Sequence, residues 1–217
     1  MSASATTQST PVTGVLAAFS DELAGTVQRV GQSVARVDAG RRYPASGIVW
    51  STAGLILTAD HVIESDDDVE IGLPDGSTAK ATIAARDASR DVALLRTSAQ
   101  MLVPLERGPE PRVGHLALAV ARPGETVATS IGVVAALSPA YRGWRGGRQE
   151  NVIWTDASFY PGFGGAALVD TAGRLIGLAT STSRTGVGLA LPVSTLEQIV
   201  SALQQHGHIK RAFLGIG

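Results

Sequence analysis

Two side chains in the first half of this 217-residue chain could together carry out acid–base chemistry. His61 stands in "LILTADHVIES", directly after a run typical of a strand, and Asp91 stands in "RDASRDVALLR", directly before another. A histidine works as a general base when a carboxylate holds its tautomer and stabilises the imidazolium that forms. Nothing in the two stretches by themselves brings the residues together, so a packed or surface histidine remains the alternative for His61.

Short β-rich runs separated by turn residues dominate the chain and must position these side chains. Six such runs without helical crossovers lie before the proline-containing stretch "SAQMLVPLERGPEPRVG", and a second set follows it. This pattern predicts an all-β fold in which the first set of strands forms an antiparallel barrel or sandwich and a second β half follows. The expected segments are a disordered segment 1–14, a first barrel half 15–97 that begins with an amphipathic helix, a connector 98–114, a second barrel half 115–193 and a C-terminal helix 194–206.

The composition argues against several classes of protein. A formal net charge of −1 and a pI near 6.4 give no electrostatic case for binding nucleic acid or an anionic membrane. The chain has no cysteine, which excludes disulfides, thiolate chemistry and cysteine-ligated zinc. No stretch approaches about 18 consecutive apolar residues, so no membrane span is expected. The amino terminus does not resemble a signal peptide, and the chain as written is expected to be cytoplasmic.

Other motifs could bind ions or nucleic acid, and each has a simpler interpretation. "HGHIK" (His206 and His208) has no third metal ligand nearby, so a polar helix terminus is favoured. "ESDDDVE" lacks the ligand alternation and the glycine of an EF-hand loop and is typical of a solvated loop. "SPAYRGWRGGRQE" mixes arginine with aromatic residues, as sites for single-stranded nucleic acid do, but one such loop on a nearly neutral chain is weak evidence. We therefore expect no metal, no cofactor and no nucleic-acid partner.

Several segments resemble, in the same order, the protease domain of the HtrA (Deg) family of trypsin-like serine proteases. They are "GLILTADHV", "RDASRDVALLR", "GETVATSIGVVAAL", "IWTDASFYPGFGGAALVDTAGRLIGLATS" and "GVGLALPVSTLEQIVSALQQHGHIKRAFLGIG". The resemblance implies a chymotrypsin-like fold of two antiparallel six-stranded β-barrels, with a catalytic histidine at His61 and a catalytic aspartate at Asp91. In the same family the arginine-rich stretch is a mobile loop beside the active site. The final "RAFLGIG" resembles the entry to a PDZ domain, which we expect this chain to lack.

The same resemblance implies a position for the nucleophile, and that position holds no hydroxyl. The family's "PGNSGGPL" aligns without a gap with "PGFGGAAL", so that Gly164 occupies the serine position and Ala166 replaces the second glycine. Without an Oγ atom no acyl-enzyme can form, and loss of the serine from a Ser-His-Asp protease costs on the order of 10⁶ in turnover. The neighbouring serines at positions 158, 181 and 183 are poor substitutes.

The alignment also implies the remaining parts of the site. Backbone N–H groups of Gly162 and Gly164 would form the oxyanion hole, which needs no side chain. Ser158 would lie near the base of the specificity pocket, with Ala179 and Thr180 on one wall. Because no carboxylate stands at Ser158, a small or medium apolar residue is expected before the cut, rather than arginine or lysine.

Two functions from different classes fit these residues. The first is an HtrA-like serine endopeptidase for unfolded or extended polypeptides, carried here in an inactive form. The second is a non-catalytic peptide-binding or scaffolding protein, in which Gly164 opens space for an extended peptide or for a carboxylate. An unrelated β-barrel binding protein would require the multi-segment likeness to be accidental. The resemblance also implies a homotrimer held partly by residues 15–30, and most members of the family act outside the cytoplasm.

Overall fold

A computed structural model describes residues 14–65, 69–142, 148–182 and 187–206 of the chain. The segment 1–14, expected to be disordered, lies outside these residues except for Gly14. The same holds for His208, for Ser183, for part of the acidic stretch at 66–68 and for part of the arginine-rich stretch at 143–147.

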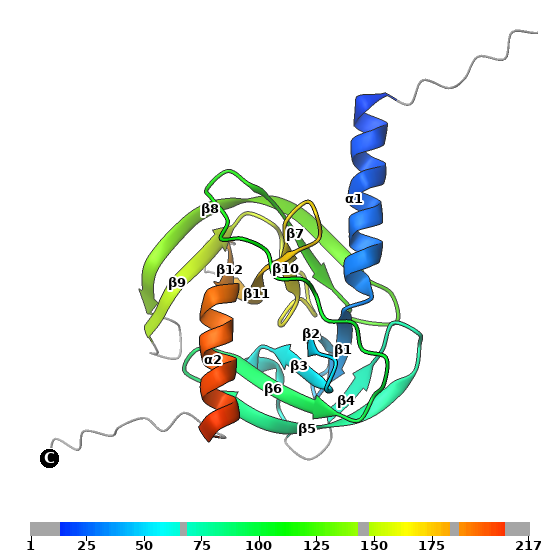
Figure 1. Cartoon of the computed structure of the whole chain (residues 1–217), viewed down its shortest axis with the longest axis vertical. Helices are drawn as coiled ribbons and strands as arrows, with labels where there is room; N and C mark the ends of the chain where they lie inside the picture. Colours follow the sequence, from blue (N-terminus) through cyan, green and yellow to red (C-terminus); the bar gives the residue numbers. More distant parts are fainter. Residues whose placement is uncertain (1–13, 66–68, 143–147, 183–186, 207–217) are drawn as a thin grey trace, which may run out of the picture.

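Two closed antiparallel barrels of six strands each form the body of the protein (Figure 1). The first barrel has the strand order β1-β2-β3-β6-β5-β4, and the second has the order β10-β11-β12-β9-β8-β7. The first six strands are β1 Val34–Asp38, β2 Ala45–Ser51, β3 Leu55–Thr58, β4 Val69–Gly72, β5 Thr78–Asp87 and β6 Val92–Thr97. The second six are β7 Leu116–Ala121, β8 Ala128–Arg142, β9 Arg148–Thr155, β10 Ala167–Val169, β11 Leu175–Thr182 and β12 Gly188–Pro192. The predicted all-β, two-barrel fold with its two helices is confirmed.

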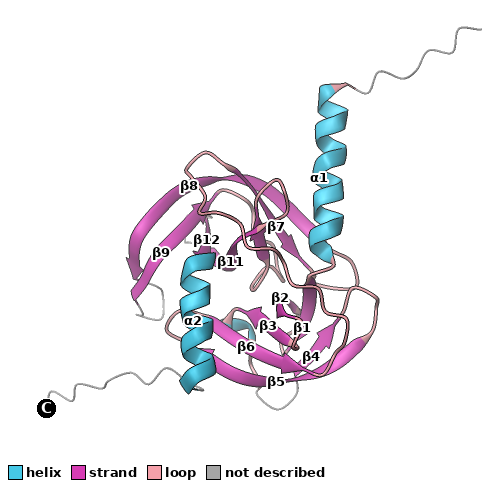
Figure 2. Cartoon of the chain, in the orientation of Figure 1, coloured by secondary structure: helices cyan, strands magenta, loops and turns pink. Residues whose placement is uncertain are grey.

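The terminal helices take different positions relative to the barrels (Figure 2). Helix α2, Val193–His206, begins one residue before the expected 194 and contacts both β11 of the second barrel and β5 of the first. Its buried residues, Leu196, Ile199, Val200 and Leu203, recur at helical spacing and join a core to which both barrels contribute. Helix α1, Val15–Gly31, packs only through its second half, and its first half extends away from the barrels (Figure 1). The α2 contacts help to fix one barrel against the other.

Arg122 connects the second barrel to the start of the first. Arg122 directly follows strand β7, and it is only 5% exposed. The guanidinium donates hydrogen bonds to the carbonyl oxygens of Val34 at 2.8 Å, Gly31 at 2.8 Å and Glu125 at 2.6 Å. Burial lowers the pKa of Arg122 from its usual value, because the charged form loses solvation.

We expect Arg122→Met to lower the free energy of unfolding by about 3 kcal/mol, because buried carbonyl oxygens lose a charged donor. Urea unfolding followed by tryptophan fluorescence measures the change. Arg96→Met is the matched control, since Arg96 is an exposed arginine on β6, and we expect it to change stability by less than about 0.5 kcal/mol. Equal stability of the two variants would contradict a linking role for Arg122.

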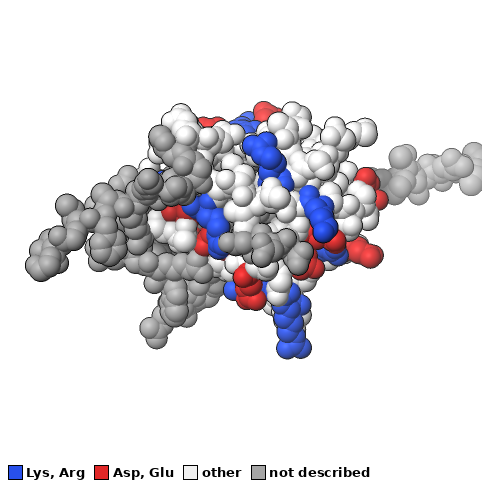
Figure 3. All heavy atoms as spheres, turned by 90° about the horizontal axis from the view of Figure 1, so that it is seen from below, with Lys and Arg blue, Asp and Glu red and all other residues white. Residues whose placement is uncertain are grey.

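The charged side chains are mixed on the face of the molecule shown in Figure 3. Basic and acidic groups alternate there, and neither sign forms a continuous patch on that face. Within the described part of the chain, no helix is both long and apolar enough to cross a membrane.

Candidate active site

His61 and Asp91 are brought together at one end of the first barrel. His61 lies in a short 3-10 turn, η1 (Asp60–Val62), directly after β3, and Asp91 lies in the turn between β5 and β6. The Nδ1 atom of His61 is 2.8 Å from Oδ2 of Asp91, and the backbone N–H of His61 donates to Oδ1 at 2.8 Å. The two side chains are 28% and 15% exposed. Because Nδ1 faces a carboxylate, the free nitrogen that faces the cleft is Nε2.

The turns that carry His61 and Asp91 each have a distinctive local structure. Asp91 has a φ of 60°, in the left-handed region that is uncommon for residues other than glycine but is adopted more often by aspartate and asparagine than by most. The preceding Asp60 is buried, and its Oδ1 accepts a hydrogen bond from Nε of Arg86 at 2.5 Å. This contact and the hydrogen bonds from His61 to Asp91 hold the turn that carries the imidazole.

Gly164 faces the free nitrogen of His61. A Cβ atom added to Gly164 would lie 3.1 Å from Nε2 and 3.3 Å from Cε1 of His61, so a side chain at this position would touch the imidazole. The φ of Gly164 lies outside the left-handed region, and the backbone therefore accepts other residues. The same Cβ would lie 2.7 Å from Cγ1 of the buried Val62, too close for an ordinary contact, so Val62 would have to shift.

Two backbone donors lie beside this position. Gly162 has a φ of 89°, and a Cβ there would run into the Pro123 ring, so only glycine fits. Within the turn, the N–H of Phe163 donates to the carbonyl of Tyr160 at 3.0 Å. Among the described residues, the N–H groups of Gly162 and Gly164 have no partner. They remain available to a bound group.

Ser46, at the start of the first barrel's β2, fixes this turn of the second barrel. Its hydroxyl donates to the Gly162 carbonyl at 2.8 Å and accepts from the Arg122 N–H at 2.9 Å. Its backbone N–H donates to the Gly164 carbonyl at 3.0 Å, and its carbonyl accepts from Oγ1 of Thr58 at 2.7 Å. The sequence analysis did not single out Ser46, because a serine at the start of a strand carries no signal of contacts with so distant a turn.

A substitution at Gly165 would show how tightly the turn that contains Gly162 and Gly164 is packed. It has a φ of 83°, and a Cβ there would overlap the Ser46 carbonyl oxygen and Oγ1 of Thr58. We expect Gly165→Ala to destabilise the protein by about 3 kcal/mol or more, from overlap added to backbone strain. Gly76→Ala is the matched control, because Gly76 also has a φ of 83° but nothing within 4 Å of its Cβ position. It should cost about 1 kcal/mol. Chemical denaturation measures both, and similar losses would contradict the close contact.

The residues predicted for the specificity pocket lie around this turn. Ser158 is exposed and its carbonyl accepts a hydrogen bond from Oγ of Ser130 at 2.6 Å. Ala179 is buried on β11, where its carbonyl accepts from the Gly165 N–H at 2.8 Å. Thr180 is buried next to it, and its hydroxyl donates to the Leu189 carbonyl at 3.3 Å. Their assignment to a substrate pocket remains a prediction.

Phe159 is a pocket candidate that the sequence analysis missed. A Cβ added to Gly188 on β12 would lie 2.8 Å from Cζ of Phe159, so the ring packs directly on that glycine. The ring also stacks on Phe163, with a centroid distance of 6.4 Å. The sequence around Phe159 gave no sign of this contact, which depends on how β12 approaches the turn.

A cleft of about 280 Å³ opens at the His61–Gly164 contact. The residues that line this cleft include Arg41, Arg42, Tyr43, Glu64 and Gly162. Within the described residues, no serine hydroxyl hydrogen-bonds to His61 and no cluster of three metal-ligating side chains occurs. The cleft therefore has a histidine–carboxylate pair and backbone donors, with Gly164 at the position that faces Nε2 of His61.

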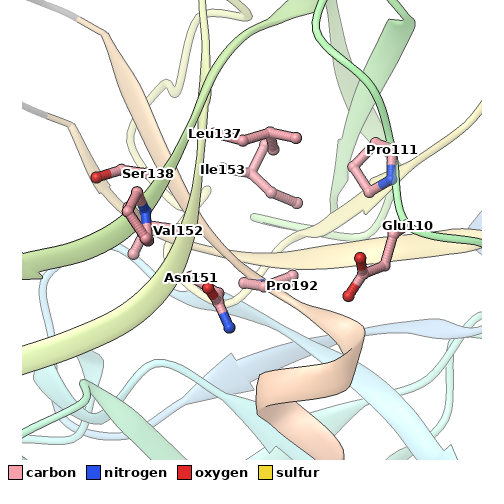
Figure 4. A pocket seen from close by; sticks show the side chains of 9 residues that line it. Glu110, Pro111, Leu137, Ser138, Asn151, Val152, Ile153 and Pro192 are labelled. Atoms are coloured by element: carbon pink, nitrogen blue, oxygen red, sulfur yellow. The ribbon is translucent and has the colours of Figure 1, made fainter.

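A second cavity, of about 330 Å³, lies on the second barrel where β8, β9 and the connector meet (Figure 4). Leu137, Ile153 and Pro111 form its apolar side, while the polar ends of Glu110 and Asn151 lie at the other side. None of its lining residues belongs to the cleft at His61.

Comparison with known proteins agrees with this geometry. A family model described as trypsin-like peptidase domain matches residues 45–178. Protease Do-like 1 of Arabidopsis thaliana is 35% identical over 182 residues, covering 79% of this chain and 42% of that protein. Serine endoprotease DegS of Haemophilus influenzae is 31% identical over 183 residues, covering 79% of this chain and 53% of that protein. The chain thus spans about half the length of these relatives.

Solved structures give the same result. An HtrA-type protease, AlgW, determined with a tripeptide, superposes with a TM-score of 0.79 at 29% identity, covering 86% of this chain and 65% of that one. The same protease with a decapeptide gives a TM-score of 0.77 at 26% identity, covering 89% and 70%.

The chain therefore belongs to the trypsin-like peptidase family. Within that family its relatives are serine proteases of HtrA (Deg) type, which confirms the resemblance predicted from the sequence.

Proposed function

We propose that this chain binds extended or unfolded polypeptides in the cleft of a trypsin-like protease fold but does not hydrolyse them through an acyl-enzyme. The observation that carries the proposal is the position of Gly164, whose missing Cβ would lie 3.1 Å from Nε2 of His61. His61 would be the general base and Asp91 its orienting partner, yet the base has no nucleophile hydroxyl from which to take a proton. Only the backbone donors and the binding surface would still act, and these alone give little catalysis.

Polypeptide binding is supported by the backbone donors and by the relatives. Gly162 and Gly164 offer N–H groups without partners among the described residues, which suits a peptide carbonyl oxygen. The structures of the HtrA-type protease AlgW contain a tripeptide or a decapeptide. A peptide-binding or scaffolding role for this chain follows from the same surfaces without any need for cleavage.

The test compares the chain with its His61→Leu variant on fluorescein-labelled unfolded casein. We expect no cleavage by either protein, while both retain casein on a gel-filtration column. Cleavage by the parent chain that disappears in His61→Leu would show that another nucleophile serves His61 and would overturn the proposal. A folded chain that neither cleaves nor retains casein would contradict the proposed polypeptide binding.

We also infer self-association through α1, as the family resemblance implies a homotrimer. Val15 and Leu16 are 86% and 83% exposed at the end of α1 that extends away from the barrels (Figure 1). Apolar side chains at such an end favour burial in an interface. We expect a trimeric mass by light scattering and a monomeric mass for Val15→Ser/Leu16→Ser. A monomeric parent chain at micromolar concentration would contradict this inference.

A further inference from the structure

We infer that the second cavity, where β8, β9 and the connector meet, is a binding site for a lysine side chain of another polypeptide. The cavity has a volume of about 330 Å³ and shares no described lining residue with the cleft at His61. The inference therefore goes beyond the function proposed for that cleft and does not depend on it. Its basis is an apolar wall beside a carboxylate without a cationic partner, which together suit an aliphatic stem that ends in an ammonium group.

Prolines on both sides of β9 explain why a cavity forms at this place. Strand β12 ends at Pro192, and its ladder to β9 stops at Ala190 opposite Ile153. On the other side of β9, the register places Pro139 of β8 opposite Asn151. Neither proline can donate a ladder hydrogen bond, and Asn151 has a φ of 57°, outside the extended region. The sheet is therefore irregular at Asn151, and the cavity lies at this irregularity.

The apolar wall of the cavity lies at the surface of the protein. Leu137, Ile153 and Pro111 form this wall (Figure 4). Ile153 is buried, whereas Leu137 is 45% exposed. An aliphatic stem can lie against these side chains while the main chain of the polypeptide that carries it stays outside the cavity.

Glu110 is the charged group among the described residues that line the cavity. Its Oε1 accepts a hydrogen bond from Oγ of Ser194, in the first turn of α2, at 3.2 Å. Within the described part of the chain, Oε2 has no hydrogen-bond partner, and Arg107 of the same connector lies over the Trp50 ring instead, at 4.3 Å. The side chain of Asn151 lies on the same side of the cavity as Glu110 and offers a second oxygen (Figure 4). These acceptors are complementary to a cation.

The hydrogen bond from Ser194 favours an ammonium over a guanidinium. Arginine binds a carboxylate most strongly through two parallel hydrogen bonds, one to each oxygen. At Glu110 the hydroxyl of Ser194 already donates to Oε1, so the two-bond arrangement would have to displace it. A lysine ammonium is a compact charge with three donors, and one oxygen from each acceptor satisfies it. The site should therefore prefer lysine to arginine.

The experiment titrates Nα-acetyl-lysine N-methylamide into the full chain carrying ¹³C-labelled methyl groups and follows the methyl signals by NMR. We expect the signals of Leu137 and Ile153 to shift, with a dissociation constant on the order of 1 mM for so small a ligand. The signals of Val62, in the cleft at His61, should not shift. The norleucine compound, which lacks the ammonium group, should bind about tenfold more weakly or less, and the arginine compound should also bind more weakly than lysine.

A pair of variants tests the carboxylate. Glu110→Gln keeps the shape of the side chain and should weaken binding of the lysine compound about tenfold, as for the loss of one charge-assisted hydrogen bond. Glu106→Gln is the matched control and should leave binding unchanged. It removes the same charge from an exposed residue of the same connector, and Glu106 does not line the cavity.

Each other outcome overturns a stated part of the inference. Equal binding of the lysine and norleucine compounds, or equal losses in the two variants, overturns recognition of the ammonium group by Glu110. Arginine binding as tightly as lysine overturns the preference for an ammonium. Binding of n-butylamine without binding of the lysine compound shows a site for free amines and overturns the polypeptide ligand. A folded chain whose Leu137 and Ile153 signals do not shift with any of these compounds has no such site.

Discussion

Gly164→Ser combined with Ala166→Gly is expected to turn this chain into a protease that cleaves unfolded casein on the order of 10³-fold faster than the parent chain. Loss of the serine from a Ser-His-Asp protease costs on the order of 10⁶ in turnover, so even partial recovery would be large. The hydroxyl would start from a Cβ that lies 3.1 Å from Nε2 of His61, which places Oγ within reach of the base. The change at position 166 restores the second of the two glycines that follow the serine in the family's motif.

The matched control is Gly164→Ala, again with Ala166→Gly. It adds the same Cβ and the same contact with Cγ1 of Val62, but no hydroxyl. Casein cleavage should therefore appear in the serine variant alone. If the serine variant is folded and inactive, Val62→Ala added to it tests whether the crowded Cβ position prevents the correct geometry. Inactivity of that variant as well would contradict the assignment of Gly164 to the nucleophile position.

Asp91→Asn in the serine-restored background is expected to lower kcat by about 10³ to 10⁴, as the corresponding change does in other Ser-His-Asp enzymes. Asparagine tolerates the φ of 60° at this position, and its amide oxygen can still accept the His61 N–H. Its NH₂ group, however, would donate to Nδ1 and leave the remaining proton on Nε2. His61 would then be unable to take a proton from the hydroxyl.

Kinetics on a peptide substrate measure this second prediction. Asp75→Asn in the same background is the control, because Asp75 lies in an exposed turn, where its carboxylate accepts hydrogen bonds from the N–H and the hydroxyl of Ser77. It should leave kcat unchanged. If Asp91→Asn retained the full kcat, the contact between Asp91 and His61 would have no part in catalysis.

The sequence predicted those features that depend on local pattern. Alternating short runs indicated the strands, whereas the pairing of His61 with Asp91 was implied only by the family resemblance. The match to the family's nucleophile stretch placed Gly164 opposite His61, where the structure also has it.

Other features depend on contacts between distant parts of the chain, and no local sequence pattern indicates these contacts. Ser46 holds the turn at Gly162 only because the two barrels meet there. In the sequence nothing distinguishes Arg122 from an exposed arginine, yet its guanidinium is buried against carbonyl groups of α1 and β1. Phe159 faces Gly188 because β12 passes beside the turn. These contacts come from the closure of the barrels rather than from the residues near each position.

The most direct measurement treats the parent chain and its Gly164→Ser and Gly164→Ala variants with a fluorophosphonate and determines their intact masses. Such a reagent forms a covalent bond with a hydroxyl that a general base activates. We predict one adduct on the serine variant, mapped by peptide sequencing to position 164, and none on the parent chain or the alanine variant. An adduct on the parent chain, or a folded serine variant that forms none even when Val62→Ala is added to it, would contradict the claim that Gly164 stands in the place of the nucleophile.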